Sequence, residues 1–278
     1  MAHALVALGS NLGDRAEQLN AALVELARLP SSRLIRRSGW FETPPIGGPA
    51  GQGAFLNGSA LLWTALAPRQ LLAELQRIEE QLGRVRGERW GARVIDLDLL
   101  LFDQLVIDDT ATADLPEINV PHPRMAFRRF VLEPATAAAP WMVHPTSGWT
   151  LQALCEQLTR GANVVAVAAS DPGDVATWVE RLRHRFVHGP RIVAWDDYHA
   201  TVDRDGVQRP KLILAFSSGE ATTLPAFHAG VRSRRMPNLP TGPIAWIPST
   251  GMAEQMVEAA AVIQAVWPEL ASIASPSD

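Results

Sequence analysis

Hydrophobic residues follow two different spacings along the first 160 residues of the chain. Four short apolar runs predict β-strands, at Ala4–Leu8, Leu34–Phe41, Phe55–Thr64 and Val94–Phe102. Between them, apolar residues recur every three to four positions in two segments that predict α-helices, Leu12–Leu29 and Pro68–Leu82. The resulting order, strand-helix-strand-strand-helix-strand, is the split βαβ pattern of ferredoxin-like α+β folds. Two shorter helical segments, near Arg124–Thr136 and Leu151–Leu158, complete a predicted first domain of residues 1–160.

After residue 160 the pattern predicts a smaller α/β domain, residues 161–278. Its strand-like apolar runs are Val164–Ala169, Arg191–Trp195, Leu212–Phe216 and Ile244–Ile247. Helical spacing is found in Asp174–Phe186 and Met252–Val266. Strands that alternate with helices in this way favour an α/β layer packed beside the first domain.

Composition excludes several classes of protein. The formal net charge of −4 is divided evenly between the two predicted domains, so we expect no binding to nucleic acid or to an anionic membrane. The chain has no apolar run of the ~18 residues that would cross a bilayer, and its first residues lack the basic region of a signal peptide. Cys155 is the only cysteine, which excludes intrachain disulfides and thiolate zinc sites. We therefore expect a cytoplasmic protein.

Basic residues are almost all arginine, because Lys211 is the only lysine among 25 lysine and arginine residues. Lys211 follows Pro210 and precedes an apolar run, which is not the context of a phosphate-binding P-loop. If the protein handles phosphates, it would do so with arginine, metal ions or backbone amides.

Two aspartates on one predicted strand are the first candidates for chemistry. In a strand, Asp96 and Asp98 lie on one face, ~6.5–7 Å apart, while Ile95, Leu97 and Leu99 face the core. Two carboxylates at that spacing can hold one or two Mg²⁺ ions on a phosphate. A solvated face of an edge strand is the alternative. Metal binding is favoured because an apolar strand seldom carries two aspartates on one face without compensating charge.

Arginines crowd the end of the second predicted helix and the loop that follows it. They are Arg77, Arg84, Arg86, Arg89 and Arg93, with Trp90 among them. Guanidinium groups suit phosphate oxygens, and an indole can stack on a base. The alternative is a basic surface loop that pairs with Glu79, Glu80 and Glu88, but surface pairs contribute little stability. We therefore favour phosphate binding.

Two further motifs are weak when each is taken alone. His122 lies between two prolines, which hold it in a stiff extended segment suited to a directional hydrogen-bond donor. A Gly- and Pro-rich segment, residues 43–53, leads to Phe55 and Asn57, an aromatic ring and a carboxamide that could bind a flat heterocycle.

Eight short segments between Ala4 and Leu158 form a set. They are Gly9-Ser-Asn-Leu-Gly13, Phe41-Glu-Thr-Pro-Pro45, Phe55-Leu-Asn57, Gln76-Arg-Ile-Glu79, Gly83-Arg-Val-Arg86, Arg89-Trp-Gly-Ala-Arg93, Ile95-Asp-Leu-Asp-Leu99 and Val120-Pro-His-Pro-Arg124. Together and in this order they resemble the 6-hydroxymethyl-7,8-dihydropterin pyrophosphokinase family of folate biosynthesis. Members of that family transfer pyrophosphate from ATP to the pterin hydroxymethyl group.

The resemblance implies a role for each matching residue. Asp96 and Asp98 would hold two Mg²⁺ ions on the triphosphate, and Arg84 and Arg93 would act on the transferring phosphates. The ATP site would be lined by Gln76, Glu79, Arg86, Trp90, Leu99, His122 and Arg128. The substrate 6-hydroxymethyl-7,8-dihydropterin would be held by Thr43, Pro44, Ile46, Phe55, Asn57 and Phe130.

Some positions depart from the family's pattern. Pro123 stands where an aromatic residue is frequent, Glu117 where a basic residue is common, and Phe55 where tyrosine is frequent. The loop from Arg86 to Trp90 is also one residue shorter than in some relatives. The first two departures and the shortened loop bear on ATP binding.

Residues 161–278 lie outside the resemblance, and their role is open. The segment from Val164 to Leu182 has the outline of a P-loop, but Asp174, Val175 and Ala176 stand where Gly, Lys and Ser/Thr would be needed. One interpretation is a degenerate P-loop layer like that of deoxynucleoside kinases, without nucleotide binding. A structural role or self-association is the other.

A rival interpretation makes the whole chain a catalytically retired scaffold or interaction protein on the same fold. The intact Asp96 and Asp98 pair argues against it, as do Arg84, Arg93 and Asn57.

Overall fold

The chain divides into two compact units. The computed structural model describes residues 1–49, 51–85, 91–109, 117–169, 172–198, 208–216, 242–248 and 250–272. The first unit consists of Met1–Met125, Phe130–Pro145 and Thr150–Gln152, and the second of Ala126–Arg129, Thr146–Trp149 and Ala153–Asp278.

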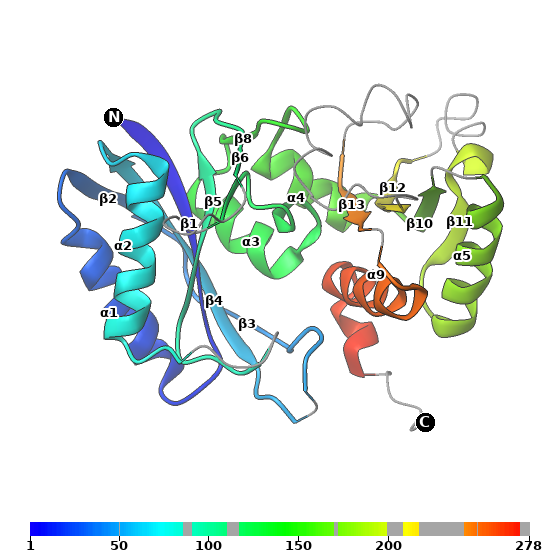
Figure 1. The fold of residues 1–278 in the computed structure, drawn as a ribbon, viewed down its shortest axis with the longest axis horizontal. Helices are drawn as coiled ribbons and strands as arrows, with labels where there is room; N and C mark the ends of the chain where they lie inside the picture. Colours follow the sequence, from blue (N-terminus) through cyan, green and yellow to red (C-terminus); the bar gives the residue numbers. More distant parts are fainter. Residues whose placement is uncertain are drawn as a thin grey trace. The chain divides into compact units, whose positions relative to one another are not determined.

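An antiparallel sheet forms the framework of the first unit (Figure 1). Its strands are β1 (Ala2–Ser10), β2 (Ser32–Arg37), β3 (Phe41–Thr43), β4 (Phe55–Thr64) and β5 (Asp96–Phe102). The order in the sheet is β2-β4-β1-β5, and β3 also pairs with β4. Helix α1 (Arg15–Ala27) connects β1 to β2, and α2 (Pro68–Gln81) connects β4 to β5. The predicted combination of helices with an antiparallel sheet is confirmed for this unit.

Both helices begin at residue types that are common at helix N-termini, and a glycine follows the end of α2. The carboxylate of Asp14 accepts a hydrogen bond from Glu17 N at 2.9 Å and so caps the start of α1. Pro68 occupies the first turn of α2, where its missing N–H costs nothing. Gly83 follows α2 with φ of 85°, a conformation that glycine adopts without strain.

The core of this unit lies between the helices and one face of the sheet. Leu19 and Leu26 of α1 and Leu75 and Ile78 of α2 are fully buried there. The predicted inward residues of β5 join the same cluster; they are Ile95, Leu97 and Leu99. The opposite face of β5 is therefore left for Asp96 and Asp98.

The single strand predicted at Leu34–Phe41 is wrong, because β2 and β3 are separate strands. Residues 38–40 interrupt the pairing: the Ser38 hydroxyl accepts a hydrogen bond from Ser59 N at 2.9 Å, and the Trp40 ring packs against Gly58. A Cβ atom on Gly58 would lie 2.3 Å from the Trp40 ring. Ser38 N still donates to Ser59 O at 2.9 Å, but Ser59 N donates to the Ser38 hydroxyl in place of a backbone carbonyl.

Short elements complete this part of the chain. Strands β6 (Ile107–Asp109) and β7 (Ile118–Val120) form an antiparallel pair that the sequence pattern did not predict. A 3₁₀ turn at Met125–Phe127 precedes α3 (Arg129–Ala138). The turn and the helix together correspond to the helical segment predicted near Arg124–Thr136. The remaining elements are β8 (Val143–His144), β9 (Trp149–Thr150) and α4 (Leu151–Arg160).

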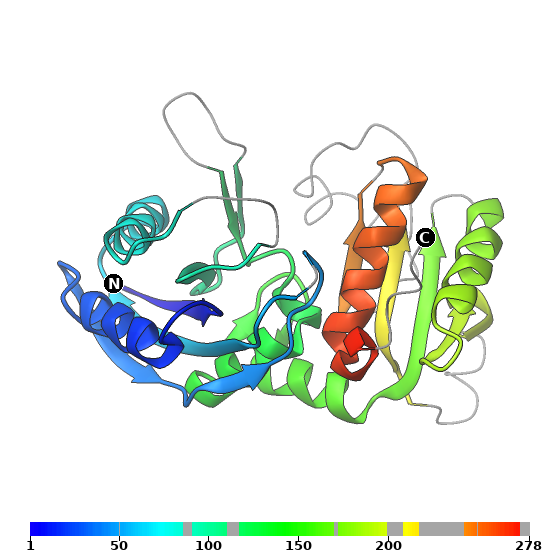
Figure 2. The same cartoon turned by 90° about the horizontal axis from the view of Figure 1, so that it is seen from below.

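The second unit has a parallel sheet in the order β11-β10-β12-β13. Its strands are β10 (Ala162–Ala169), β11 (Arg191–Ala194), β12 (Pro210–Phe216) and β13 (Ile244–Ile247). Helix α5 (Pro172–Arg185) packs on β10 and β11, and α9 (Met252–Val266) packs on β12 and β13. Figure 2 shows both helices alongside the strands. A 3₁₀ turn at Pro268–Ser272 follows α9.

Both faces of this parallel sheet are buried, as parallel sheets require. Trp178 of α5 stacks on Phe216 of β12 with ring centroids 4.2 Å apart. A separate cluster contains alternate residues of β10, such as Ala166, together with Trp195 and Tyr198, which follow β11.

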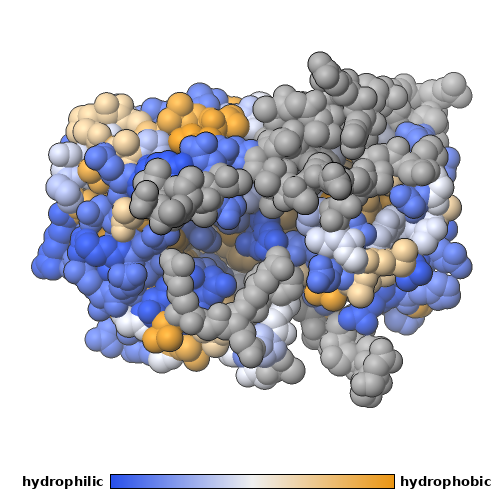
Figure 3. Space-filling model, viewed as in Figure 1, coloured by the Kyte–Doolittle hydropathy of each residue, from blue (hydrophilic) through white to orange (hydrophobic). Residues whose placement is uncertain are grey.

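None of the helices in the described residues has the length and hydropathy needed to cross a bilayer. Of the surface coloured in Figure 3, most is hydrophilic, and hydrophobic residues form small separate groups.

Candidate active site

The strand register places one residue of each predicted site, the pterin site and the metal site, in a single row across the sheet. Gly9, at the end of β1, pairs with Asn57 of β4 on one side and with Asp96 of β5 on the other. Residues directly opposite each other project from the same face, and adjacent strands are about 4.8 Å apart. Asn57 and Asp96 are therefore about 10 Å apart across Gly9. A Cβ on Gly9 would approach Asn57 Oδ1 to 3.2 Å, so glycine allows this close arrangement.

Two arginines bind Asp96, the first residue of the aspartate pair. Asp96 and Asp98 are both half-buried and lie on the face opposite the core. Arg84 Nη2 is 2.7 Å from Asp96 Oδ1, and Arg93 Nη1 is 2.5 Å from Asp96 Oδ2. Both carboxylate oxygens of Asp96 are thus bound by guanidinium groups.

Glu79 extends this arrangement into the core. Its side chain is only 4% exposed, and Oε1 accepts a hydrogen bond from Leu97 N at 2.6 Å. The same oxygen forms an ion pair with Arg84. Glu79 therefore fixes Arg84 to the start of β5, where Asp96 stands. Of the partners that the surface alternative named, Glu79 does pair with Arg84, but it is buried. Arg77 pairs with Glu74 of the same helix.

Burial and charge alter the protonation of these groups. The pKa of Glu79 is raised to about 7: burial is the main cause and the charge of Asp96 adds to it, while the hydrogen bond from Leu97 N and the charge of Arg84 lower it. Burial also raises the pKa of Asp96, as does the charge of Asp98, against the lowering effect of Arg93 and Arg84. For Arg84, burial lowers the pKa, but Asp96 and Glu79 outweigh it and the net direction is upward. The site therefore favours additional positive charge near the aspartates.

The donor set suits a magnesium ion that is shared with a substrate. Asp96 and Asp98 supply hard carboxylate oxygens, and both are accessible from one face of the sheet. Within the described ranges, no group of three or more His, Cys, Asp or Glu side chains is placed to hold a metal. Mg²⁺ usually takes one or two carboxylates and completes its shell with phosphate oxygens and water. The residues present fit that mode of binding.

Three of the residues predicted for the pterin are brought together. Asn57 Nδ2 donates to Thr43 Oγ1 at 2.8 Å, and Thr43 pairs with Phe55 across β3 and β4. Pro44 and Ile46 follow Thr43 in the segment of residues 43–53, which we call the pterin loop. Phe130 lies in the first turn of α3 and is half-buried.

The residues predicted for ATP are more dispersed. Gln76 and Glu79 are on α2, while the Leu99 side chain is buried in the core, so only its backbone is available to a ligand. His122 follows β7; its N–H donates to Leu100 O at 2.8 Å, and its Nδ1 accepts from Arg124 N at 3.2 Å. Arg128 precedes α3 and is half-buried. Arg86 and Trp90, with the loop between them, lie outside the described residues.

The sequence predicted no role for Asn11, which was included only as part of the Gly9–Gly13 segment. Asn11 directly follows β1 and is 6% exposed. It exchanges two hydrogen bonds with the backbone of Arg93 and also reaches the pterin loop. The available signal was its place in the Gly9–Gly13 segment, immediately after a buried strand.

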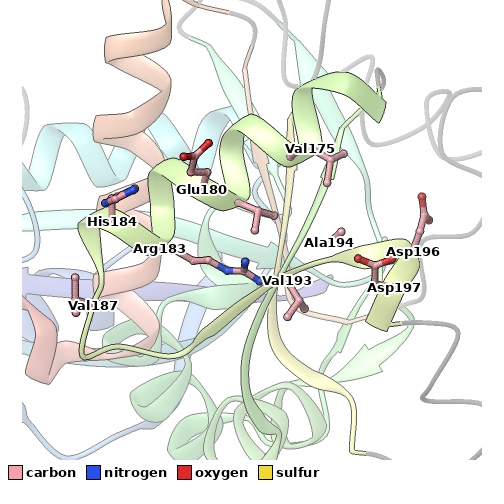
Figure 4. A pocket seen from close by; sticks show the side chains of 11 residues that line it. Val175, Glu180, Arg183, His184, Val187, Val193, Ala194, Asp196 and Asp197 are labelled. Carbon is pink, nitrogen blue, oxygen red and sulfur yellow. The ribbon is translucent and has the colours of Figure 1, made fainter.

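The second unit has a cavity of about 700 Å³ between α5 and β11 (Figure 4). Its charged lining residues are Glu180, Arg183, His184, Asp196 and Asp197, and its apolar ones include Val175 and Ala176. Arg183 Nε donates to Ile192 O at 2.8 Å. Three carboxylates against one arginine make this cavity unsuited to a phosphate.

The first unit thus combines a carboxylate pair, two arginines and an amide-lined loop at one end of an antiparallel sheet. Residues 5–140 match the model of the 7,8-dihydro-6-hydroxymethylpterin-pyrophosphokinase (HPPK) family. The chain belongs to this family.

Known proteins agree with that assignment. The 2-amino-4-hydroxy-6-hydroxymethyldihydropteridine pyrophosphokinase of Pseudomonas aeruginosa is 49% identical over 135 residues, which cover 49% of this chain and 79% of that protein. The Bacillus subtilis protein of the same name is 36% identical over 186 residues, 66% of this chain and 96% of that protein. A crystal structure of Plasmodium falciparum HPPK-DHPS with pteroate covers 80% of this chain and 56% of its own at 12% identity. Its TM-score of 0.45 is too low to support an inference.

Proposed function

We propose that the first unit transfers pyrophosphate from ATP to the hydroxymethyl group of 6-hydroxymethyl-7,8-dihydropterin. The products are AMP and the pterin diphosphate, a step of folate biosynthesis. The protein is thus an ATP-dependent diphosphotransferase, as its family membership indicates. The observation that carries the proposal is the row Asn57–Gly9–Asp96, which places the Asn57 carboxamide beside the carboxylate and arginine cluster.

The proposed division of labour follows from the needs of phosphoryl-type transfer. Such reactions depend on charge neutralisation and on placing the two reactants in line, more than on covalent help from the protein. Arg84 and Arg93 would turn from Asp96 towards the phosphates, with Glu79 holding Arg84 in place. Gln76, Arg86, Trp90, Leu99, His122 and Arg128 would line the nucleotide site.

Asp96 and Asp98 would hold Mg²⁺, two ions by the family resemblance, which would neutralise charge on the triphosphate. Asn57 and Thr43 would present hydrogen-bonding groups to the edge of the pterin. Phe55 and Phe130 would supply apolar contact to its faces, and Pro44 and Ile46 would close the pocket from the pterin loop.

For the second unit, taken as residues 161–278, we propose a role without nucleotide binding. The sheet order corresponds to 2-1-3-4 in chain order, which is shared with doubly wound folds. The acidic cavity and the residues Asp174, Val175 and Ala176 support the absence of a phosphate site. Descent from a P-loop kinase, self-association through this unit and cytoplasmic localisation stay predictions from the sequence.

A test of the function is Mg²⁺-dependent formation of AMP from ATP and 6-hydroxymethyl-7,8-dihydropterin by the full chain. We expect AMP and pterin diphosphate in equal amounts, and neither when the pterin or Mg²⁺ is left out. Folded protein that forms no AMP would instead favour the scaffold interpretation.

A further inference from the structure

Asn11 connects two parts of the first unit that are far apart in sequence. On one side, Arg93 N donates to Asn11 Oδ1 at 2.7 Å, and Asn11 N donates to Arg93 O at 3.0 Å. This reciprocal pair holds the backbone of the residue whose guanidinium binds Asp96. Because the Asn11 side chain is buried, water cannot readily replace these bonds.

On its other side, Asn11 reaches the end of the pterin loop. Its Nδ2 is 3.3 Å from Gln52 Oε1 and 3.5 Å from Gly53 O, so each of its two N–H groups has an acceptor in the loop. Gln52 Nε2 in turn lies 3.3 Å from Pro49 O and 3.5 Å from Gly47 O, within the same loop. A continuous set of polar contacts therefore runs from the loop through Asn11 to Arg93.

The ends of the pterin loop have a second anchor that does not include Arg93. Arg15 Nη1 donates to Ala54 O at 2.7 Å, and its Nη2 donates to Glu42 Oε2 at 2.8 Å. The loop could thus be held closed without Asn11. What Asn11 adds is the connection to Arg93.

We propose that Asn11 is a positioning residue that links the pterin loop to Arg93. Ordering of the loop around the pterin would fix Gln52 and Gly53, and through Asn11 the backbone of Arg93. The guanidinium is then held where the transferring phosphate passes. The inference rests on the proposed function, and it assigns to Asn11 a part in the reaction without contact with either substrate.

The test compares full-length variants by their kcat for AMP formation and by calorimetric affinity for the pterin. Asn11→Ala removes the side-chain contacts with Arg93 N and with the loop, and it leaves only the backbone bond from residue 11 N to Arg93 O. We expect about tenfold weaker pterin binding together with a kcat about tenfold lower. Arg15→Ala loosens the loop ends only, and should weaken pterin binding with a much smaller change in kcat. Asn20→Ala, on the exposed side of α1, serves as the matched control and should change neither.

A double substitution separates this role from general damage to the fold. If Asn11 acts through Arg93, the Asn11→Ala/Arg93→Ala protein has the same kcat as Arg93→Ala, within about threefold. Independent, multiplying losses overturn the proposal, and so does an Asn11→Ala protein whose kcat equals that of Asn20→Ala. Turnover by the wild-type chain reports separately on the proposed function.

If Asn11→Ala does not fold, Asn11→Asp tests the loop-facing arm, because it keeps the acceptor for Arg93 N and removes the donor. We expect pterin affinity to fall about tenfold while the affinity for an unreactive Mg²⁺–ATP analogue, measured without pterin, is retained. Unchanged pterin affinity in Asn11→Asp overturns the link.

Discussion

Asp96 and Asp98 project away from the core, so their removal changes chemistry rather than packing. We expect Asp96→Ala or Asp98→Ala to lower turnover more than about 100-fold, because each loses a ligand for a metal that neutralises the phosphates. Both variants should still fold, with thermal unfolding closest to wild type for Asp98→Ala, because Asp96→Ala also removes ion pairs of Arg84 and Arg93. Asp109→Ala, which removes an exposed partner of Arg69, is the control. Turnover within about tenfold of wild type, ~1.4 kcal/mol of barrier, would contradict the assignment.

Arg93 is 28% exposed and bound to Asp96, which permits it to turn towards a phosphate. We expect Arg93→Ala to lower kcat more than it weakens ATP binding, since charge on the transferring group is greatest in the transition state. Steady-state kinetics with a direct measurement of ATP affinity checks this. Unchanged kcat with poorer affinity would give Arg93 a role in ground-state binding only.

Glu79 makes the stability of the protein depend on pH. Its pKa is about 7 in the folded state against an ordinary value of 4.5, so between these values the folded protein binds more protons than the unfolded chain. The contribution of Glu79 to stability is fully present below pH 4.5 and is lost as the pH rises to about 7. The loss is up to about 3 kcal/mol, because one pKa unit corresponds to ~1.4 kcal/mol.

Denaturant unfolding of wild type and Glu79→Gln at several pH values between 4.5 and 8 measures this effect. The free energy of unfolding of the wild type should fall relative to that of Glu79→Gln as the pH rises, and the difference should level off above pH 7. Glu80→Gln, the exposed neighbour on α2, should run parallel to wild type. A constant difference between wild type and Glu79→Gln would show that Glu79 does not titrate in this range.

At the scale of elements, the break between β2 and β3 depends on the contact of Trp40 with Gly58. Gly58→Ala places a methyl group within the ring's volume, and we expect a loss of about 1–3 kcal/mol in the free energy of unfolding. Because β3 carries Thr43, pterin affinity should fall as well. Gly39→Ala is the control, since a Cβ there meets no atom within 4 Å. Equal stabilities of the two variants would contradict this account.

The sequence predicted elements well where spacing and end signals agree. β4 and α9 have the predicted bounds, because a long apolar run or a regular helical face defines each one. The break at Ser38 could not be predicted, since it depends on Ser59 and Gly58 from a distant strand. Strands β6 and β7 have only three residues each, too few for a spacing pattern.

In the candidate site, too, the features that are local in sequence could be predicted and the long-range contacts could not. The carboxylate pair and its arginines are close together in the sequence, so their residue types and spacing were enough to predict a charged site. Asparagine is a common residue in turns, so Asn11 did not stand out in the sequence. Its contacts with Arg93 and Gln52 depend on the tertiary fold. Glu79 was expected at the nucleotide, and only the structure reveals its bond to Leu97 N.

At the scale of the whole molecule, the prediction is a single nucleotide site per chain. Calorimetric titration of the full chain with an unreactive Mg²⁺–ATP analogue should give a stoichiometry of about one, because the cavity in the second unit is acidic. The same titration of the Asp96→Ala/Asp98→Ala protein should show no remaining site. A second, unaffected site would place nucleotide binding in residues 161–278.

Truncation after Thr159 tests whether the second unit is needed for catalysis. We expect residues 1–159 to retain pyrophosphate transfer, with changed solubility or assembly, since the carboxylates, Arg84, Arg93 and Asn57 all lie before that point. A folded fragment without transfer activity would mean that the second unit supplies part of the site.

The position of Gly9 has a consequence for how the sequence of this protein can change. Because one residue of β1 pairs with Asn57 on one side and with Asp96 on the other, the register of β1 fixes the positions of both candidate binding residues. Deleting or inserting a single residue in β1 would turn its side chains to the opposite face and shift both neighbours out of line at once. Length changes in the loops can be absorbed locally, but in this strand they would need two compensating changes in separate strands.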